Sequence, residues 1–407
     1  MPDVAPHAEQ SPEPARGVGA VLLWACFLAA SWTWVIGMLF PVLLVRDYGL
    51  AGWIVFAIPN VVGAAAMGFV IATPALSRRV VSHHGEACFR FSEICIALHV
   101  FAVGWAYTLL FPGIWGVMAT GLFAVVVFMA GARSRWVLVA TAAAVGVSLL
   151  TLLAWLAAPE IGLDDAPPRG ALSLRDLALF TPAAVLGFIL SPYLDLTFHR
   201  ARQATTPTTG RWAFAVGFGA FFLAALVLSL LYARTLRPLF PLHDEPLDMD
   251  VPDALIYILA AHLTIQAGVT VALHLREIGE RRGHAGLHRA GMLAIAGAAL
   301  AWWAVTEPEL YLGQTAGELV YRGFLLFFGL VFPAYVWLCM LPTRHPTPAG
   351  TRLAVYLVTL LFVVPMGYYG FLVGDSGWML GGVMTLVVAR LAVEWLPGDR
   401  QPEAGSG

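Results

Sequence analysis

Lysine is absent from this sequence, and charged residues of any kind are scarce. The 23 basic residues of the 407 are all arginines, charged residues make up 12% of the chain, and hydrophobic residues make up 59%. Soluble domains contain roughly 25% charged residues, so the composition excludes an ordinary soluble protein and predicts an integral membrane protein. The net charge of −2 gives no support for a nucleic-acid partner. The arginine bias is typical of a GC-rich genome and indicates a bacterial source.

Cysteine is also rare, and the usual catalytic motifs are missing. No CxxC pair occurs, and we interpret the four cysteines as small apolar packing residues: Cys26, Cys88, Cys95 and Cys339. His83 and His84 lack a set of further ligands, so no metal site is expected. The sequence contains no P-loop, GxSxG, HExxH or dinucleotide fingerprint. We therefore expect no enzyme, no cofactor and no ATP-driven transport by this chain alone.

Long apolar runs dominate the chain instead. A span of about 20 apolar residues crosses a bilayer, and the first run is too long, after a proline-rich acidic tail, to be a cleaved signal peptide. Twelve segments meet this measure, approximately 19–45, 51–74, 89–111, 114–131, 136–158, 177–198, 212–234, 252–275, 289–305, 317–340, 352–371 and 377–395. The sequence thus predicts an all-α polytopic membrane protein with about 12 transmembrane helices.

Charge patterning predicts the orientation and the division of the chain. Arginines concentrate in the connections that face the cytoplasm if the N-terminus is inside, as basic residues generally do. We therefore expect a multi-pass protein of the cell (inner) membrane with both termini cytoplasmic. The expected parts are a disordered tail at 1–18, a five-helix repeat at 19–158, a second five-helix repeat at 175–340, two additional helices at 351–396 and a disordered tail at 397–407.

Two apolar segments carry helix-breaking residues at related positions. GMLFPVLL contains Gly37 and Pro41, and GFILSPYLDL contains Gly187 and Pro192, with the two glycines 150 residues apart. That separation equals five spans with their loops, and an odd number of spans inverts the second copy. Inverted-repeat transporters bind substrate at the midplane, where the first helix of each repeat is broken. Helix breakers are common in membrane helices anyway, as Pro333 illustrates, so ordinary kinks are the alternative.

Several stretches resemble the sodium/solute symporters, a family of the amino acid/polyamine/organocation transporter superfamily. They are RDYGLAGWIVFAIPNVVGAAAMGFVIATPALSRR at 46–79, SHHGEACFRFSE at 82–93, and the G-x-x-x-x-P pattern of Gly187 and Pro192. The matches cover roughly residues 30–210 and are loose apolar patterns. The resemblance implies a leucine-transporter-like fold, with a 5+5 inverted repeat plus two C-terminal helices, and transport by alternating access.

One departure from that family concerns the coupling ion. Sodium-coupled members carry a pattern like AAxxSTxDS on the eighth core helix, whose hydroxyls complete a sodium site. The corresponding stretch here is AAHLTIQAG at 260–268, in which only Thr264 supplies a hydroxyl. A sodium ion needs about five or six oxygen ligands, so sodium coupling is doubtful and a proton is the alternative. The candidate ion-coupling residues are Thr264, Asp195 and His99.

Candidate substrate-binding residues cluster around the two breaks and on the eighth segment. Aromatic and hydroxyl side chains deep in an apolar span suit a pocket with apolar walls and a few polar anchors, and intramembrane ionisable residues are functional candidates. The set is Trp32, Thr33, Trp34, Gly37, Gly187, Ser191, Pro192, His262 and Gln266. Interfacial tryptophans and a histidine bonded to a neighbouring helix are the alternatives.

Taken together, the sequence predicts a secondary transporter of a small polar organic solute, ion- or proton-coupled, with the lipid bilayer and that solute as partners. One alternative is a non-transporting membrane sensor or assembly subunit with a transporter-like fold. Another is an intramembrane protease, because AGELVYRGFLLFFG resembles an EExxxR signature. In that stretch Gly317 replaces the first glutamate, and Glu318 with Arg322 suits an ordinary ion pair at i, i+4 spacing.

Overall fold

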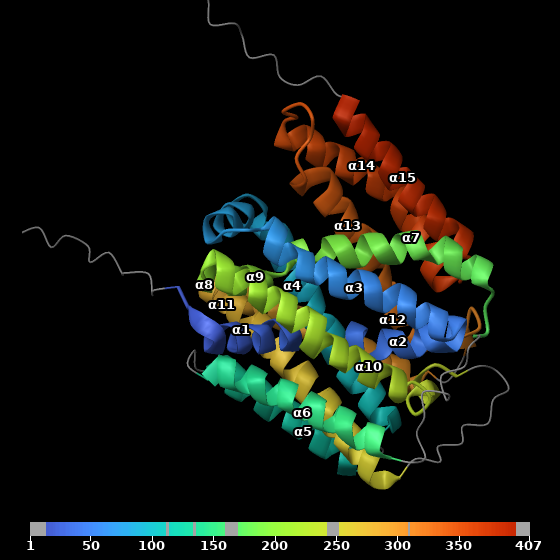
Figure 1. Ribbon diagram of the computed structural model, residues 1–407. Coiled ribbons are helices and arrows are strands. Elements are labelled where there is room, and N and C mark those ends of the chain that lie inside the picture. The colour runs from blue at the N-terminus through green and yellow to red at the C-terminus, as the bar shows by residue number, and fades with distance from the viewer. Residues whose placement is uncertain are drawn as a thin grey trace, which may run out of the picture.

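The protein is almost entirely helical (Figure 1). The computed structural model describes residues 14–110, 114–132, 136–158, 170–241, 252–307 and 310–395. The helices of the first half are α1 Gly17–Trp32, α2 Val35–Tyr48, α3 Leu50–Val70, α4 Pro74–Leu110, α5 Ile114–Ala132 and α6 Val137–Ala157. The predicted tails at 1–18 and 397–407 lie outside the described residues apart from 14–18, where α1 already begins.

The second half alternates α-helices with short 3-10 and π segments. It opens with α7 Leu174–Leu190, the 3-10 turn η3 Ser191–Leu194, α8 Leu196–Ala204, α9 Pro207–Val216, the π segment η4 Gly217–Phe222, α10 Leu223–Leu231, the 3-10 turn η5 Arg237–Leu239 and α11 Asp253–Thr306. A short antiparallel hairpin follows, in which the strands β1 Leu310–Tyr311 and β2 Gln314–Thr315 have two residues each. The chain ends in α12 Ala316–Leu326, η6 Phe327–Val331, α13 Phe332–Tyr335, η7 Val336–Met340, α14 Ala349–Gly367, η8 Tyr368–Leu372 and α15 Ser376–Trp395.

The apolar helices confirm a multi-pass membrane protein. Within the described ranges, nine helices are long and apolar enough to cross a bilayer, and the bent pair α1–α2 makes a tenth. α11 contains a non-helical residue, Gly283, and covers two of the predicted segments, 252–275 and 289–305. α5 overlaps the predicted segment 114–131. The total of twelve spans and the inverted relation of the halves stay predictions.

The first break lies earlier than the sequence indicated. α1 and α2 meet at an angle of 57°, and the two non-helical residues between them are Thr33, with φ −75° and ψ 65°, and Trp34, with φ −79° and ψ 171°. Gly37 and Pro41 both lie inside α2, so the expectation that they interrupt the helix was wrong. A proline removes one backbone hydrogen bond from the helix and strains the preceding turn. A membrane helix tolerates this loss because the neighbouring helices packed around it satisfy the freed backbone groups.

The second break lies where the sequence placed it. α7 ends at Leu190, Pro192 lies in the 3-10 turn η3, and Asp195 has an extended backbone with φ −77° and ψ 114°. The Asp195 side chain then caps α8 by accepting a hydrogen bond from the backbone N–H of Thr197. Asp is a preferred N-cap residue because its carboxylate satisfies a free N–H of the first turn.

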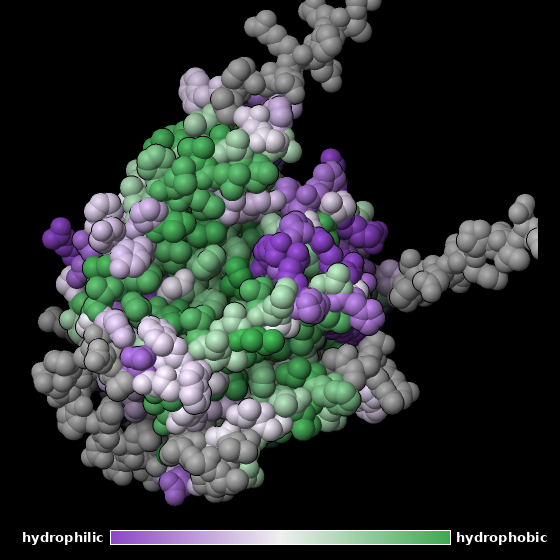
Figure 2. Space-filling model, turned by 180° about the vertical axis from the view of Figure 1, so that it is seen from behind, coloured by the Kyte–Doolittle hydropathy of each residue, from purple (hydrophilic) through white to green (hydrophobic). Residues whose placement is uncertain are grey.

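Close helix packing brings the two broken helices together. α3 packs against α7, and a Cβ on Gly63 of α3 would lie 2.4 Å from the carbonyl oxygen of Phe188, so only glycine allows this approach. α14 and α15 lie side by side at one edge of the bundle, and α5 and α6 lie at the opposite edge (Figure 1). Apolar side chains cover much of the face in Figure 2, and hydrophilic side chains gather at one end.

Candidate functional site

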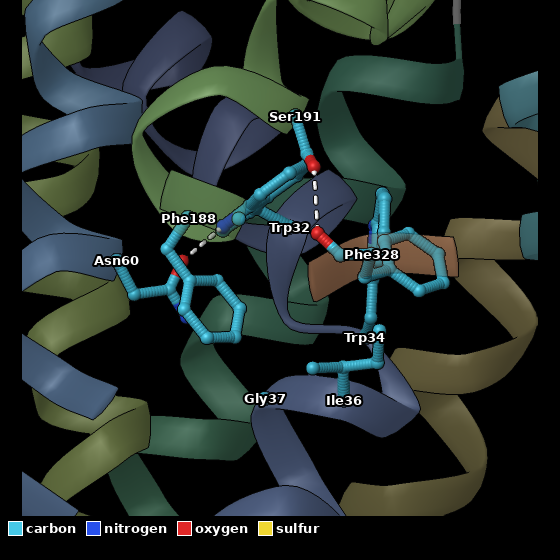
Figure 3. Close-up of a pocket in the computed structure, with 9 residues that line it drawn as sticks. Trp32, Trp34, Ile36, Gly37, Asn60, Phe188, Ser191 and Phe328 are labelled. Carbon is cyan, nitrogen blue, oxygen red and sulfur yellow. Dashed lines mark hydrogen bonds between the residues drawn. The ribbon is translucent and has the colours of Figure 1, made fainter. Parts of the chain in front are cut away.

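A small cavity lies where the two helix breaks meet (Figure 3). The residues that line it come from the α1–α2 junction, α3, α7, η3 and η6: Trp32, Trp34, Ile36, Gly37, Asn60, Gly187, Phe188, Ser191 and Phe328. Its volume is about 10 Å³, which is room for about one water molecule. The cavity therefore has to widen before it can hold an organic solute.

Two hydrogen bonds fix the polar groups of this cavity. The indole Nε1 of Trp32 donates to the Oδ1 of Asn60 over 2.7 Å, which ties the end of α1 to α3 (Figure 3). The Ser191 hydroxyl donates to the carbonyl oxygen of Phe328 over 3.3 Å, which ties η3 to the π segment η6. A Cβ on Gly187 would lie 2.7 Å from the same carbonyl oxygen. Both features hold the second break against η6.

Aromatic rings make the walls of the cavity. The ring centroids of Trp32 and Trp34 are 4.3 Å apart, and those of Trp34 and Phe328 are 5.3 Å apart. Trp32 also packs on Phe198 of α8, at 4.9 Å between centroids. Rings at these separations attract each other beyond simple area burial. Apolar walls with a few placed polar groups are typical of small-molecule sites.

Several carbonyl groups near the end of α1 accept hydrogen bonds from side chains of the protein. A broken helix frees its last carbonyl oxygens, and such oxygens can bind cations. Here the Thr33 hydroxyl donates to Ala29 over 2.8 Å, and the Thr270 hydroxyl of α11 donates to Ala30 over 3.0 Å. The Ser31 hydroxyl donates to Leu28 over 3.0 Å. Side-chain donors thus occupy one acceptor position on each of these three oxygens and leave fewer positions for a cation.

The structure brings five of the nine predicted substrate-binding residues to the cavity: Trp32, Trp34, Gly37, Gly187 and Ser191. Thr33 and Pro192 lie at the breaks but are not among the residues that line it. His262 and Gln266 face elsewhere. Gln266 donates to the Ala144 carbonyl and to the Ser148 hydroxyl, both on α6, and His262 lies beside the ring of Tyr232.

The three candidate ion-coupling residues lie in different surroundings. The Thr264 hydroxyl donates to the Ala260 carbonyl of its own helix, over 2.7 Å. Asp195 is fully buried, and its Oδ1 accepts hydrogen bonds from the N–H and the hydroxyl of Thr197, while Oδ2 has no partner in the part of the chain that the structure describes. His99 packs against the ring of Trp34, at 6.3 Å between centroids. Of the three, only His99 contacts a residue of the cavity.

Sequence reasoning missed several residues of the site. Asn60 is a buried amide in an apolar span, and a search confined to ionisable residues overlooks it. On α11, His262 and Gln266 begin a row of polar residues spaced by four, which continues with Thr270 and His274. Residues four apart lie near one face but drift around a helix. The row therefore starts against α6 and ends against α1 and α4, where Thr270 and His274 meet the break.

A buried cluster of four charged residues closes one end of the site. Arg46 at the end of α2 donates both Nη groups to Glu318 of α12, each over 2.8 Å. Arg322 donates to Glu318 over 2.8 Å and to Asp47 over 3.0 Å. The Glu318 side chain is only 1% exposed and that of Arg46 is 6% exposed. Bidentate arginine–carboxylate contacts in such surroundings are strong and specific.

A second set of ion pairs closes the opposite end, where α8 ends (Figure 1). Arg200 of α8 donates to Glu277 of α11 over 2.6 Å, and Arg289 of α11 donates to Glu93 of α4 over 2.6 Å. Arg282 of α11 also pairs with Glu86 of α4. All nine residues that line the cavity are buried, so the cavity is enclosed within the protein, an arrangement that we call occluded.

Comparison with known proteins identifies the type of fold. No family model and no curated protein matches the chain. Among solved structures, the chain is similar to a Na⁺-coupled sialic acid symporter in a substrate-bound outward-open state, with 13% identity, 91% of this chain and 89% of that chain covered, and a TM-score of 0.56. The fold is of the leucine-transporter type. Mhp1 in an inward-facing conformation also matches, with 12% identity, coverage of 95% and 94%, and a TM-score of 0.42.

Proposed function

We propose that this chain is a secondary transporter that moves a small polar organic solute across the cell membrane by alternating access. The observation that carries the proposal is the cavity at which the α1–α2 break and the α7–η3 break converge. A solute bound there contacts both broken helices at once, so its binding energy can favour one arrangement of those helices over another. A sodium/solute symporter-like function is the finer form of this proposal.

The lining of the cavity favours a neutral or zwitterionic solute. Its polar groups are the indole of Trp32, the amide of Asn60, the hydroxyl of Ser191 and the backbone around Gly37, and none of the lining side chains is charged. Ile36 and Gly37 place the N-terminal end of α2 at the cavity, and the positive end of its helix dipole favours a negative group on the solute. Indole and phenyl rings would cover its apolar part.

The residues present do not suit sodium at the end of α1. The carbonyl oxygens of Ala29 and Ala30 already accept hydrogen bonds from Thr33 and Thr270, and Thr264 is bonded within its own helix. A sodium ion would have to displace these donors and still find about five or six oxygens. We therefore derive no step of transport through sodium at this position.

Transport requires the occluded arrangement to open toward each side of the membrane in turn. Opening toward one side separates Arg46 from Glu318, and opening toward the other separates Arg200 from Glu277. Because the first pair is more deeply buried than the second, its separation exposes charges to water that are now shielded. A bound solute that fills the widened cavity offsets part of that cost through its own contacts.

A non-transporting sensor with this fold would bind a solute as a transporter does, but it would not move the solute across the membrane. The first experiment therefore tests binding: thermal unfolding of the purified protein against a panel of neutral and zwitterionic metabolites. A ligand bound only by the folded state stabilises it by RT ln(1 + c/Kd), where c is the ligand concentration, so Tm rises as c exceeds Kd. We expect at least one solute to do so, and to lose the effect in Asn60→Leu but keep it in Thr151→Val, a matched substitution away from the cavity.

If no solute in a broad panel shifts Tm, or if Asn60→Leu keeps the full shift, the cavity is not the binding site. Flux in proteoliposomes then separates the two functions. Saturable exchange of the stabilising solute supports the transporter, and stabilisation without any exchange supports the sensor.

A further inference from the structure

Two histidine rings from different helices flank the tryptophan at the first break. Trp34 precedes α2, and its ring lies 6.3 Å from that of His99 on α4 and 5.8 Å from that of His274 on α11, measured between centroids. The indole Nε1 of Trp34 donates to the carbonyl oxygen of Ser31 at the end of α1. Trp34 therefore connects the break to both histidines, and a change of charge on either ring acts on the break directly.

The hydrogen bonds of His99 keep its ring neutral. Its Nδ1 donates to the carbonyl oxygen of Cys95 over 2.6 Å, so Nδ1 carries the proton. Its Nε2 accepts the backbone N–H of Val35 over 3.4 Å, at the first turn of α2. A second proton on Nε2 would break that bond and would place a positive charge at the positive end of a helix dipole. His99 thus positions α2 and has no nitrogen free for a further proton.

His274 differs from His99 in having a free nitrogen. A hydrogen bond of 3.1 Å joins its Nδ1 to the Ser92 hydroxyl of α4. Its Nε2 has no hydrogen-bond partner in the described residues, although the side chain is fully buried. Because the Ser92 hydroxyl can either donate or accept, the ring can gain or lose a proton without losing that bond. This is what a reversible proton-binding group requires.

Of the buried bases near the break that the structure describes, His274 is the one whose ring nitrogen is left free by the groups around it. Glu277, one turn later on α11, is paired with Arg200 and Arg281. α5 and α6 contribute no titratable side chain within their described residues. Titratable and charged groups on the other elements that contact α11 include Cys26 on α1, Cys88, Glu93, Cys95 and His99 on α4, Asp195 at the N-cap of α8, His199 and Arg200 on α8, and Tyr321 on α12.

We propose that His274 is a proton-binding site at the helix break, and that Trp34 is the group that responds to its occupancy. A proton from water adds to the free nitrogen of His274 when the site is open, and it leaves by the same atom on the other side. The imidazolium is attracted to the indole ring, whereas the neutral ring packs on it edge to face, as in the occluded structure. Resting on the proposed secondary transport, this proton is the coupling ion.

The test follows Trp34 by ¹⁹F NMR in protein labelled with 5-fluorotryptophan and reconstituted in lipid nanodiscs. The resonance that Trp34→Phe removes is assigned to Trp34, which separates it from the other 13 of the 14 tryptophans. Spectra of the wild type, His274→Asn and His262→Asn are recorded across the range in which histidines ordinarily titrate, roughly pH 5 to 8. Asn keeps a group in reach of Ser92 but lacks the free nitrogen.

We expect the Trp34 resonance to shift in one step in the wild type and in His262→Asn, and to stay fixed in His274→Asn. His262 is the matched control because it is also a buried histidine of α11 with a ring nitrogen that has no partner among the described residues, but it lies beside Tyr232. If His274→Asn fails to fold, His274→Gln takes its place. A step that persists without His274, or no step in the wild type, overturns the proposal. The measurement needs no flux, so loss of the proposed transport activity would be recognised separately.

Discussion

The hydroxyl of Thr270 donates a 3.0 Å hydrogen bond to the carbonyl oxygen of Ala30, and so joins α11 to the end of α1 at the first break. Thr270 is fully buried. In a fold that places ion sites between a broken helix and its neighbours, this contact is a direct protein bond. A side chain of a neighbouring helix thereby takes part in holding the break.

This arrangement predicts that sodium does not stabilise the protein. Because Ala29 and Ala30 already have donors, sodium ions should find no vacant oxygens there. We expect the thermal unfolding temperature in sodium chloride to equal that in choline chloride at the same ionic strength. A saturable rise in Tm with sodium alone would contradict this, because ligands stabilise only through specific binding to the folded state.

Thr270→Val should weaken the protein more than an isosteric change elsewhere. The substitution leaves the Ala30 carbonyl buried without its side-chain donor, which costs about 1–3 kcal/mol. The control is Thr151→Val on α6, because the Thr151 hydroxyl donates only to the Val147 carbonyl of its own helix. Denaturant unfolding in mixed micelles compares the two. Equal free energies of unfolding for both variants would show that the α11–α1 bond adds no stability.

The two glycines that line the cavity should respond differently to alanine. A Cβ on Gly187 would lie 2.7 Å from the carbonyl oxygen of Phe328, whereas a Cβ on Gly37 would lie 3.5 Å from the nearest atom, on the Phe222 ring. Overpacking typically costs 1–3 kcal/mol, so Gly187→Ala should lower stability by about that amount and Gly37→Ala by much less. Solute affinity should fall with Gly187→Ala. Similar behaviour of both variants would contradict the packing argument.

The buried ion pairs should matter more than the exposed ones. Glu318→Gln leaves Arg46 and Arg322 with Asp47 alone, and removing one partner of a buried pair costs about 3–5 kcal/mol. Glu86→Gln is the control, because the Glu86 side chain is 53% exposed and exposed pairs contribute about 0–1 kcal/mol. The free energies of unfolding in mixed micelles give the difference. A larger loss for Glu86→Gln would show that the α2–α12 cluster does not hold the occluded state.

More of the fold than of the candidate site could be predicted from the sequence. Twenty-residue apolar runs identify membrane helices because the bilayer leaves few other structures available, and the break at Pro192 was located from its position in such a run. The first break was misplaced at Gly37 and Pro41. The interruption at Thr33 depends on tertiary contacts that spacing does not encode, such as the bond from Trp32 to Asn60.

The polar residues of α11 illustrate why the site could be predicted only in part. His262 and Gln266 look suited to a pocket because they are polar residues deep in an apolar span. Which face of a helix meets the cavity is set by the neighbours, however, and Gln266 is bonded to Ser148 of α6. One and two turns later, the same row reaches the break through Thr270 and His274. The sequence shows that these polar residues are spaced by four, but it does not show which neighbouring helices each of them faces.

Solute exchange across a membrane tests the central claim most directly. Proteoliposomes containing the wild-type protein are loaded with the unlabelled solute that stabilises it, and entry of the radiolabelled solute is followed without any imposed ion gradient. We expect saturable exchange that is abolished in Gly187→Leu and retained in Gly37→Ala, with both variants folded. The absence of exchange by the folded wild-type protein, or full exchange by Gly187→Leu, would contradict transport through the cavity between the two broken helices.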